Sequence, residues 1–433
     1  MTIKYKKSPV GEIPIDWLCN TLGNIATVKG GKRMPKGTSF SESKTQYPYI
    51  RVSDFINGTV STNNLKYVLE EDREKIKRYT ISINDLYISI AGSIGIVGSV
   101  PEVLDGSQLT ENAAKIIFNN NLKTTKNYYK HFLQSDNCQS QFIQETGTGG
   151  GVPKLALFRI ENTYIPCPPL PEQKKIAKIL TSVDEVIETT EAQINKLKDL
   201  KKGMMNELLT KGIGHTEFKD SAVGRIPMEW KVKKLGALCE KITDGSHLSP
   251  KTVKNGLPIA TVENMKDYYI DISSCRTIGH SDFDALLKNT CSPNYNDVLF
   301  SKDGTVGKTF VYKQMDKIVL LSSIAIITTK KGELFPDYLT QFLKSPLFYD
   351  EIENSKTGSA IRRIILRELK NLPITFPSFD EQQKIAKNLT SIDTNIDQKQ
   401  IKLTQTKNLK KSLMADLLTG RVRVNLSENQ ESL

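Results

Sequence analysis

Features that would direct this chain into or across a membrane are missing from its sequence. No apolar run approaches the about 18–20 residues that a membrane-spanning helix needs. The opening stretch Met1–Trp17 has basic residues but no apolar segment after them, so we expect no secretory signal. Only six cysteines occur in 433 residues, and none forms a Cys-x-x-Cys pair, which predicts reduced thiols. The expected compartment is the cytoplasm, with no membrane partner.

Catalytic signatures are equally scarce. There are only four histidines, and no Asn/Asp-Pro-Pro-aromatic, Gly-x-Ser-x-Gly or His-Glu-x-x-His motif is present. The segment Lys302–Thr309 (KDGTVGKT) approaches a phosphate-binding loop, but such a loop needs its first glycine at the position of Lys302. We therefore expect a binding protein with no catalytic residue, metal or cofactor. The Gly-Thr-Val-Gly piece is expected to form a tight turn after a strand.

Charge and length are the first positive indications. The chain has 60 Lys and Arg residues against 48 Asp and Glu residues, a formal net charge of +12 that favours a polyanionic partner. Its 38% hydrophobic and 25% charged residues are typical of soluble globular domains. A chain of this length accommodates two or three such domains.

Internal repetition predicts the architecture. Gly11–Trp17 (GEIPIDW) recurs as Gly224–Trp230 (GRIPMEW), and Glu172–Asp184 recurs as Glu381–Asp393 with ten of thirteen residues identical. The chain is therefore two copies of one unit of about 210 residues. The ends of the unit match closely, whereas the interiors, residues 24–165 and 237–372, have diverged.

A zinc site is an alternative interpretation of one cluster in the second copy. Zinc could in principle be bound by Cys239, His247, Cys275, His280 and Cys291. These residues lack the paired short spacing of zinc ligands, and at an offset of 213 residues Ala26 and Met34 stand where Cys239 and His247 would be. We favour scattered core residues and expect no metal.

Each copy ends in a predicted helix of about 38 residues. Apolar positions alternate at spacings of four and three through each helix, which is typical of a coiled-coil seam, and Gly212 and Gly420 follow the last turns. Two matching seams favour pairing of the helices as an antiparallel coiled coil with pseudo-twofold symmetry. The alternative is that each helix packs only on its own domain.

The interiors carry short β-branched runs separated by glycine-rich turns, and one aromatic-rich helix each, so each interior is predicted to be α+β with mixed or antiparallel sheets. The strands are expected at Tyr49–Val52, Asp85–Ile90 and Ala114–Phe118, and at Ile259–Val262, Asp297–Ser301 and Ile324–Thr328.

Taken together, the repeat, the GEIPxxW entry, the Gly-Ser/Thr-Ile/Val-Gly turn, the EQxxIAxxL helix start and the LLT helix end resemble the specificity (S) subunit of type I restriction-modification systems. The resemblance covers about residues 8–424. It implies two target-recognition domains that each read half of a bipartite double-stranded DNA site. It also implies two helices that set the spacer and dock two methyltransferase (M) subunits.

Further partners follow from the same resemblance. Restriction (R) subunits would join the complex, which would be an adenine-specific DNA methyltransferase and ATP-dependent restriction endonuclease. S-adenosylmethionine, ATP and Mg would be used by those partner subunits and not by this chain. The implied domains are recognition domain 1 (1–170), spacer helix 1 (171–212), recognition domain 2 (213–379), spacer helix 2 (380–420) and a polar tail (421–433).

Candidate DNA contacts are basic and small polar residues near the predicted glycine-rich turns. Basic side chains would hold phosphates, while Arg51, Arg362 or Arg363 would pair with guanine. The candidates are Lys29, Lys32, Arg33, Lys36, Arg51, Ser53, Ser93 and Lys154 in the first copy, and His247, Lys251, Thr261, Lys302, Lys308, Arg362 and Arg363 in the second.

Two other functions compete with DNA recognition. The chain could be a coiled-coil adaptor whose domains bind protein, or an enzyme with an unfamiliar site. The positive charge and the missing motifs argue against the enzyme. Salt-dependent binding to duplex DNA distinguishes the adaptor from the specificity subunit.

Overall fold

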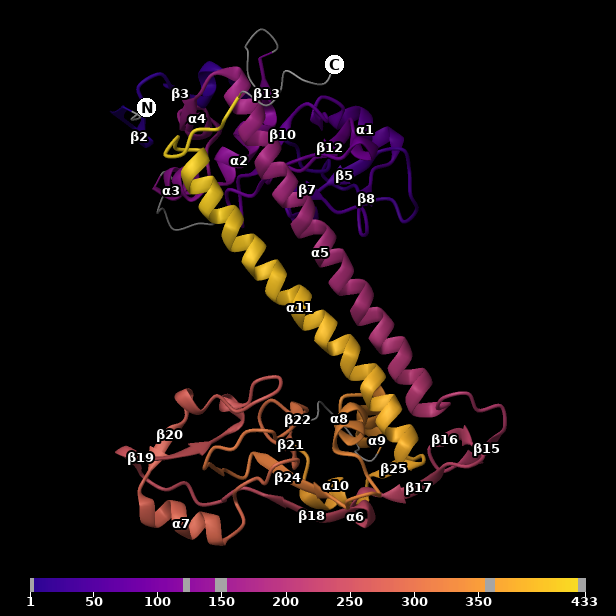
Figure 1. Cartoon of the computed structure of the whole chain (residues 1–433). Coiled ribbons are helices and arrows are strands. Elements are labelled where there is room, and N and C mark those ends of the chain that lie inside the picture. Colours follow the sequence, from indigo (N-terminus) through magenta and orange to yellow (C-terminus); the bar gives the residue numbers. More distant parts are fainter. Residues whose placement is uncertain (1–3, 120–124, 145–153, 355–362, 427–433) are drawn as a thin grey trace. The chain divides into compact units, whose positions relative to one another are not determined.

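The computed structural model describes residues 4–119, 125–144, 154–354 and 363–426, and the chain divides into two compact units. Unit 1 contains residues Met1–Ala192 and Ile401–Leu433, so it joins both ends of the chain (Figure 1). Unit 2 is the continuous stretch Gln193–Gln400. No helix within the described ranges combines the length and apolar character required to cross a membrane.

Unit 1 is built on an antiparallel four-stranded sheet. Its strands, in spatial order, are β11 (Val97–Ser99), β10 (Leu86–Ser89), β13 (Ala113–Phe118) and β4 (Ala26–Gly30). All four residues of β10 are buried, which suits the large hydrophobic side chains of Leu86, Tyr87 and Ile88. Helices α2 (Lys126–Gln134), α3 (Asp136–Gln144) and α4 (Leu157–Glu161) accompany this sheet, and their side chains share its core.

A second sheet of unit 1 is mixed. It has the order β8 (Lys66–Tyr67), β5 (Pro48–Ile50), β12 (Ser107–Leu109) and β9 (Thr80–Ile81), with β5 and β12 parallel. Helix α1 spans Glu70–Ile76. The smaller pairs are β1 (Tyr5–Ser8) with β2 (Gly11–Pro14), β3 (Leu18–Thr21) with β14 (Tyr164–Cys167), and β6 (Phe55–Ile56) with β7 (Thr59–Val60).

Unit 2 repeats this topology. Its antiparallel sheet has the order β22 (Thr309–Val311), β21 (Val298–Ser301), β24 (Ile324–Thr329) and β18 (Cys239–Asp244). Its mixed sheet has the order β20 (Arg276–Ile278), β19 (Thr252–Ala260) and β23 (Val319–Leu320). The remaining elements are β15 (Phe218–Ser221), β16 (Gly224–Pro227), β17 (Lys231–Lys234), β25 (Pro373–Phe376), α6 (Leu235–Leu238), α7 (His280–Lys288), α8 (Pro336–Leu343), α9 (Pro346–Asn354) and α10 (Leu366–Asn371).

The predicted α+β class is confirmed, and each copy has a strand at its three predicted places. Two of these strands end before the predicted residue, because Val52 and Val262 begin short 3-10 helices after β5 and β19. One correspondence within the repeat needs correction. Strand β18 carries a register shift between Cys239 and Lys241, which adds one residue and moves the offset from 213 to 214. His247 consequently matches Arg33 and not Met34.

The two long helices are α5 (Leu170–Thr210) and α11 (Phe379–Leu417). Gly212 and Gly420 follow them with φ of +70° each, the left-handed conformation that glycine adopts without strain. The first turns of α5 and the last turns of α11 share the core of unit 1, where Ile176 and Leu417 belong to the same cluster as Phe132 (Figure 1). In unit 2, Met205 of α5 and Ile385 of α11 belong to one core cluster.

Candidate nucleic-acid interface and helix anchors

In unit 1 three separate stretches meet at one end of the antiparallel sheet. They are the chain after β4, the turn after β10 and the segment before α4. Backbone hydrogen bonds join the Gly31 amide to the Ala113 carbonyl (2.9 Å), the Ala91 amide to Asn112 (3.3 Å) and the Leu155 amide to Ile90 (2.9 Å). The candidate residues of these stretches, Lys32, Arg33, Ser93 and Lys154, are thereby held close together.

The equivalent stretches meet in unit 2. The Gly245 amide donates to Ile324 (3.2 Å), the Lys302 amide to Ser323 (2.9 Å) and the Ile364 amide to Lys302 (2.8 Å). Isolated bridges Ala91–Lys154 and Asp303–Arg363 also correspond to one another. Both units therefore present a similar three-stretch surface from diverged sequences.

Close backbone packing requires a glycine at the root of each surface. A Cβ atom on Gly31 would lie 2.1 Å from the Thr110 carbonyl oxygen, and one on Gly245 would lie 2.1 Å from the Leu320 carbonyl oxygen. No other residue fits this approach without moving the backbone. The glycines thus fix where the basic loop leaves the sheet.

The glycine turns are confirmed as tight turns after strands. Gly92 and Gly95 have φ of +75° and +84°, and Gly304 and Gly307 have φ of +72° and +103°. Ser89 at the end of β10 closes its turn by accepting the Ile96 amide hydrogen (2.8 Å), and Ser301 does the same for Lys308 (2.7 Å). The segment Lys302–Thr309 is this turn and not a phosphate-binding loop.

Most basic candidates of unit 1 are open to solvent. Lys29, Lys32, Lys36 and Lys154 are exposed, and the Arg33 side chain is 78% exposed although it pairs with Glu111 at 2.6 Å. Burial would raise the pKa of Glu111, but hydrogen bonds from Arg33, the Glu111 backbone and Thr110 hold that pKa below its usual range. Ser53 and Ser93 are also exposed.

Two DNA-contact candidates, Arg51 and Thr261, instead cap short helices. The Arg51 guanidinium donates from Nε to Asp54 Oδ2 (3.1 Å) and from Nη2 to Asp54 Oδ1 (2.7 Å) and the Asn64 carbonyl (3.0 Å). At the equivalent place, the amide of Thr261 donates to Asn264 Oδ1 (2.9 Å). These side chains hold the chain after β5 and β19, which leaves Arg51 little capacity for a bidentate contact with guanine.

Lys302, a candidate for DNA contact, does not present its charge at the surface of unit 2. Lys302 is 2% exposed and its ammonium lies 3.0 Å from Asp244 Oδ2, inside the domain. Its repeat position matches the partly buried Ile90, a signal of burial that the sequence already contained. Lys308 is half-buried and donates to the Met265 carbonyl (2.9 Å).

Other candidates of unit 2 remain at the surface. The His247 side chain is 68% exposed and lies 3.3 Å from Asp244, and Lys251 is exposed. Arg363 lies 3.5 Å from Asp303 with its side chain 55% exposed. Arg362 lies outside the described residues.

The zinc alternative finds no support in the part of the chain that the structure describes. No group of three or more His, Cys, Asp or Glu side chains there is placed to hold a metal ion. Cys239 is a buried core residue, and burial raises the pKa of its thiol to about 12. It is therefore protonated and apolar in character at neutral pH.

Sequence reasoning missed the buried anchors at the ends of the long helices. In unit 1 the indole of Trp17 donates to Glu172 Oε2 (3.0 Å), and Arg423 pairs with both Glu172 (2.6 Å) and Asp16 (2.8 Å). In unit 2 the indole of Trp230 donates to Glu381 Oε2 (3.1 Å), and the His215 ring lies 2.9 Å from Glu381 Oε1. The sequence did contain a signal for these anchors, because the same Trp and Glu residues occur at matching positions in both copies.

A second pair of anchors lies further along the helices. The Asp184 carboxylate pairs with the Lys410 ammonium at 2.6 Å. The His131 ring lies beside Asp184, and the Nε2 atom of His131 is 3.1 Å from Thr181 Oγ1. The unit 2 counterpart joins Asp393 to Lys201 at 2.7 Å and to the Gln341 amide at 3.0 Å. Burial, with Lys130 and Lys410 adding to it, lowers the pKa of His131 to about 3.

Comparison with known proteins follows the repeat. Residues 14–199 and 227–407 each match the family described as type I restriction modification DNA specificity domain. The type I restriction enzyme MjaVIII specificity subunit of Methanocaldococcus jannaschii is 28% identical over 422 residues, which are 95% of this chain and 94% of that protein. The EcoBI specificity subunit of Escherichia coli is 22% identical over 94% of this chain and 86% of its own length.

Solved structures support the fold. A type I restriction-modification S subunit from M. genitalium has a TM-score of 0.58 at 15% identity, over 96% of this chain and 99% of that one. A chain from a study of complex assembly and conformational transition in a type I restriction-modification system has a TM-score of 0.53 at 18% identity, over 95% of this chain and 99% of that one.

Proposed function

Because this chain belongs to the type I restriction-modification DNA specificity family, it serves DNA target recognition, and we propose that each of its two units reads one half of a bipartite duplex site. The observation that carries this division is the recurrence of one three-stretch surface in both units. The glycines and the strand topology recur, while the exposed side chains differ. A shared scaffold with different surface residues suits two different half-sites.

Phosphate contacts are assigned to the exposed basic residues of these surfaces. In unit 1 they are Lys29, Lys32, Arg33, Lys36 and Lys154, and in unit 2 they are His247 and Lys251, while the exposed Arg363 is proposed to pair with guanine. Ser93 is a small polar group at the same surface of unit 1, and the exposed Ser53 of the short helix after β5 is proposed as a further polar contact. Arg51, Thr261 and Lys308 would act through the loops that they hold in place, since their polar atoms are already engaged.

The long helices are proposed to pair as an antiparallel coiled coil with pseudo-twofold symmetry. Within each unit, residues later in α5 contact residues earlier in α11. Unit 1 pairs Asp184 with Lys410 and Glu191 with Lys407, while unit 2 pairs Gln193 with Lys399 and Lys201 with Asp393. This order supports opposite helix directions, and a coiled coil would set the spacer between half-sites.

The catalytic steps are proposed to belong to partner subunits. Two methyltransferase subunits would dock on the helices and methylate adenine with S-adenosylmethionine, and restriction subunits would use ATP and Mg to cleave. This chain would contribute target choice without binding those cofactors. The cytoplasm is the proposed location, because there the complex would meet the genome and incoming DNA.

One pair of measurements tests the function. Sequencing that detects methylated adenine in the host genome should reveal a bipartite motif with an unread spacer, lost when the gene for this chain is deleted. The purified chain should bind a duplex carrying that motif with an affinity that falls as salt rises. An adaptor without DNA recognition would show neither result.

A further inference from the structure

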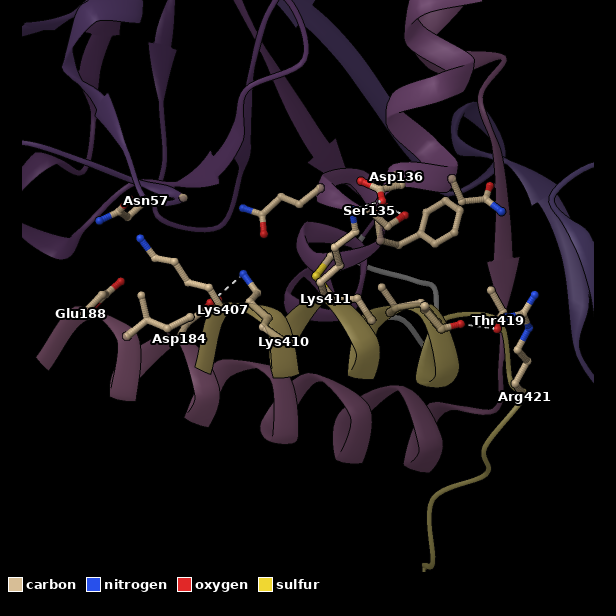
Figure 2. Close-up of a pocket in the computed structure, with 18 residues that line it drawn as sticks. Asn57, Ser135, Asp136, Asp184, Glu188, Lys407, Lys410, Lys411, Thr419 and Arg421 are labelled. Carbon is tan, nitrogen blue, oxygen red and sulfur yellow. Dashed lines mark hydrogen bonds and ion pairs between the residues drawn. The ribbon is translucent and has the colours of Figure 1, made fainter. Parts of the chain in front are cut away.

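One groove in unit 1 is not used by the proposed reading of DNA. It has a volume of about 490 Å³ and lies between residues 184–188 of α5, the last turns of α11, the α2–α3 junction and the β6–β7 turn (Figure 2). Its floor is apolar and includes Phe132, Ile187 and Met414, and its rim includes Glu188 and Arg421. An apolar floor with a charged rim is typical of a site that receives one anchoring side chain.

The repeat reveals what such a site accepts. The hairpins after the two helix caps match without a gap, because Phe55 pairs with Val60 and Met265 bridges to Ile270. Gly58 in the first hairpin therefore corresponds to Tyr268 in the second. In the repeat, Gln134 at the end of α2 corresponds to Lys344 after α8, and Glu188 on α5 corresponds to Asp397 on α11.

In unit 2 the chain supplies its own aromatic side chain at this place. The Lys344 ammonium lies 5.3 Å from the centroid of the Tyr268 ring, and burial together with the neighbouring Asp397 carboxylate raises the pKa of Tyr268. In unit 1 the two-residue turn has φ of +48° at Asn57 and +75° at Gly58, so glycine suits the turn and no side chain extends from position 58. The groove therefore lacks an aromatic side chain at the place where unit 2 carries the half-exposed Tyr268.

The groups that would hold such a ring are available. Glu188 is exposed and lines the groove from α5 (Figure 2), and it matches Asp397 in the repeat. The Arg421 side chain is exposed and makes no hydrogen bond or ion pair with any residue that the structure describes. It also borders an adjoining cavity of about 440 Å³ that shares Asn137 and Thr419 with the groove.

We propose that this groove is a docking site for a segment of the methyltransferase subunit that presents a tyrosine or tryptophan next to a carboxylate. The ring lies on Phe132 and Met414, its hydroxyl or indole N–H donates to Glu188, and the neighbouring carboxylate pairs with Arg421. Protein is favoured over DNA because the floor is apolar and the lysines of the lining, Lys407, Lys410 and Lys411, are already paired with Glu191, Asp184 and Asp136. This inference rests on the proposed function.

The first test fills the groove from within. Ala415 is an exposed residue of α11 that lines the groove, and Asn206 is its exposed counterpart on α5 in unit 2. Ala415→Trp should weaken binding of the methyltransferase subunit by about tenfold or more, as loss of a buried aromatic anchor does. Asn206→Trp is the matched control and should leave that affinity within about twofold of the original chain. Equal affinities for the two variants and the original chain overturn the proposal.

A smaller change guards against misfolding of the tryptophan variant. Glu188→Ala removes the proposed acceptor and should weaken methyltransferase binding several-fold, whereas Glu185→Ala changes an exposed residue three positions earlier on the same helix and should not. Unchanged binding by Glu188→Ala, with unchanged thermal unfolding, contradicts the assigned acceptor and overturns the proposal.

Two further readouts separate this proposal from the function on which it rests. All four variants should bind the target duplex like the original chain, and a selective loss of DNA binding by Ala415→Trp would overturn the assignment to protein. If the original chain binds neither DNA nor methyltransferase, the proposed function itself fails. A benzophenone amino acid at Lys411 should cross-link to a methyltransferase peptide with an aromatic residue beside Asp or Glu, and any other cross-link overturns the proposal.

Discussion

The carboxylate of Asp184 on α5 lies 2.6 Å from the ammonium of Lys410 on α11, and in unit 2 the roles are exchanged, with Asp393 on α11 2.7 Å from Lys201 on α5. Each long helix thus carries one aspartate and one lysine, and each of them forms an Asp–Lys ion pair with the other helix. A helix with both partners can pair with a copy of itself.

A fragment ending at Glu217 should therefore form a symmetric dimer. Lys201 of each copy can replace Lys410, and His215 can replace Arg423 beside Glu172, because both pairs occupy matching repeat positions. Analytical ultracentrifugation should show a dimer, and methylation supported by the fragment should occur at a palindromic site. A well-folded monomer would contradict the proposed helix pairing.

Replacing Lys32 and Arg33 together by alanine should weaken binding to every duplex sequence. Each lost phosphate contact should reduce the slope of log K against log salt by about 0.9, so a decrease of up to about 2 is expected. Fluorescence anisotropy over a salt series measures this slope. Lys196→Ala with Lys198→Ala removes the same charge from an exposed face of α5 and serves as the control. An unchanged slope would exclude the loop after β4 from the interface.

Exchange of residues 24–165 for the interior of another family member should change only one half of the methylated motif. The helix anchors Trp17 and Glu172 lie outside the exchanged interior, so the scaffold should persist. Sequencing of methylated adenine in cells that express the chimera provides the measurement. Alteration of both halves would show that the two units do not read independently.

Insertion of one heptad into each long helix should lengthen the spacer without changing the half-sites. The insertions belong after Ala192 and after Gln400, where the two units divide the helices and no core residue such as Met205 is displaced. Seven residues rise about 10.5 Å, or about three base pairs. A methylated motif with the original spacer would exclude the helices as the element that sets it.

Stability of unit 1 should decrease below about pH 6.5. Burial lowers the pKa of His131 to about 3 in the folded chain, whereas an unfolded chain has the ordinary value of about 6.5. The unfolded chain therefore binds the proton first as the pH falls, and about 2 kcal/mol of stability is lost by pH 5. Urea unfolding at pH 7 and pH 5 measures the loss.

Two variants isolate the histidine from other titrating groups. His131→Gln introduces the residue found at the matching position 341, whose amide donates to Asp393 at 3.0 Å, and should reduce the pH dependence. Gln341→His should introduce the same dependence into unit 2. A pH dependence that survives His131→Gln unchanged would assign the effect to other groups.

Much of the architecture was predictable because it depends on local pattern. The repeat, the long helices and the strands follow from hydrophobic periodicity, and the turns after β10 and β21 follow from glycines that adopt positive φ. The Trp17–Glu172 anchor lies 155 positions apart in the chain, so no local pattern could place it, although its recurrence in both copies marked both residues.

The sequence by itself determined two copies of one α+β unit, their closing helices and their family. Only the tertiary structure decided which charges are available. Lys302 and Lys32 are both lysines beside glycine-rich turns, yet one is buried against Asp244 and the other is exposed. Burial and ion pairing of a side chain depend on segments that are distant in sequence. A one-residue shift in β18 changes which of its side chains face those segments. The same dependence leaves the groove beside Gly58 open while Tyr268 occupies its counterpart.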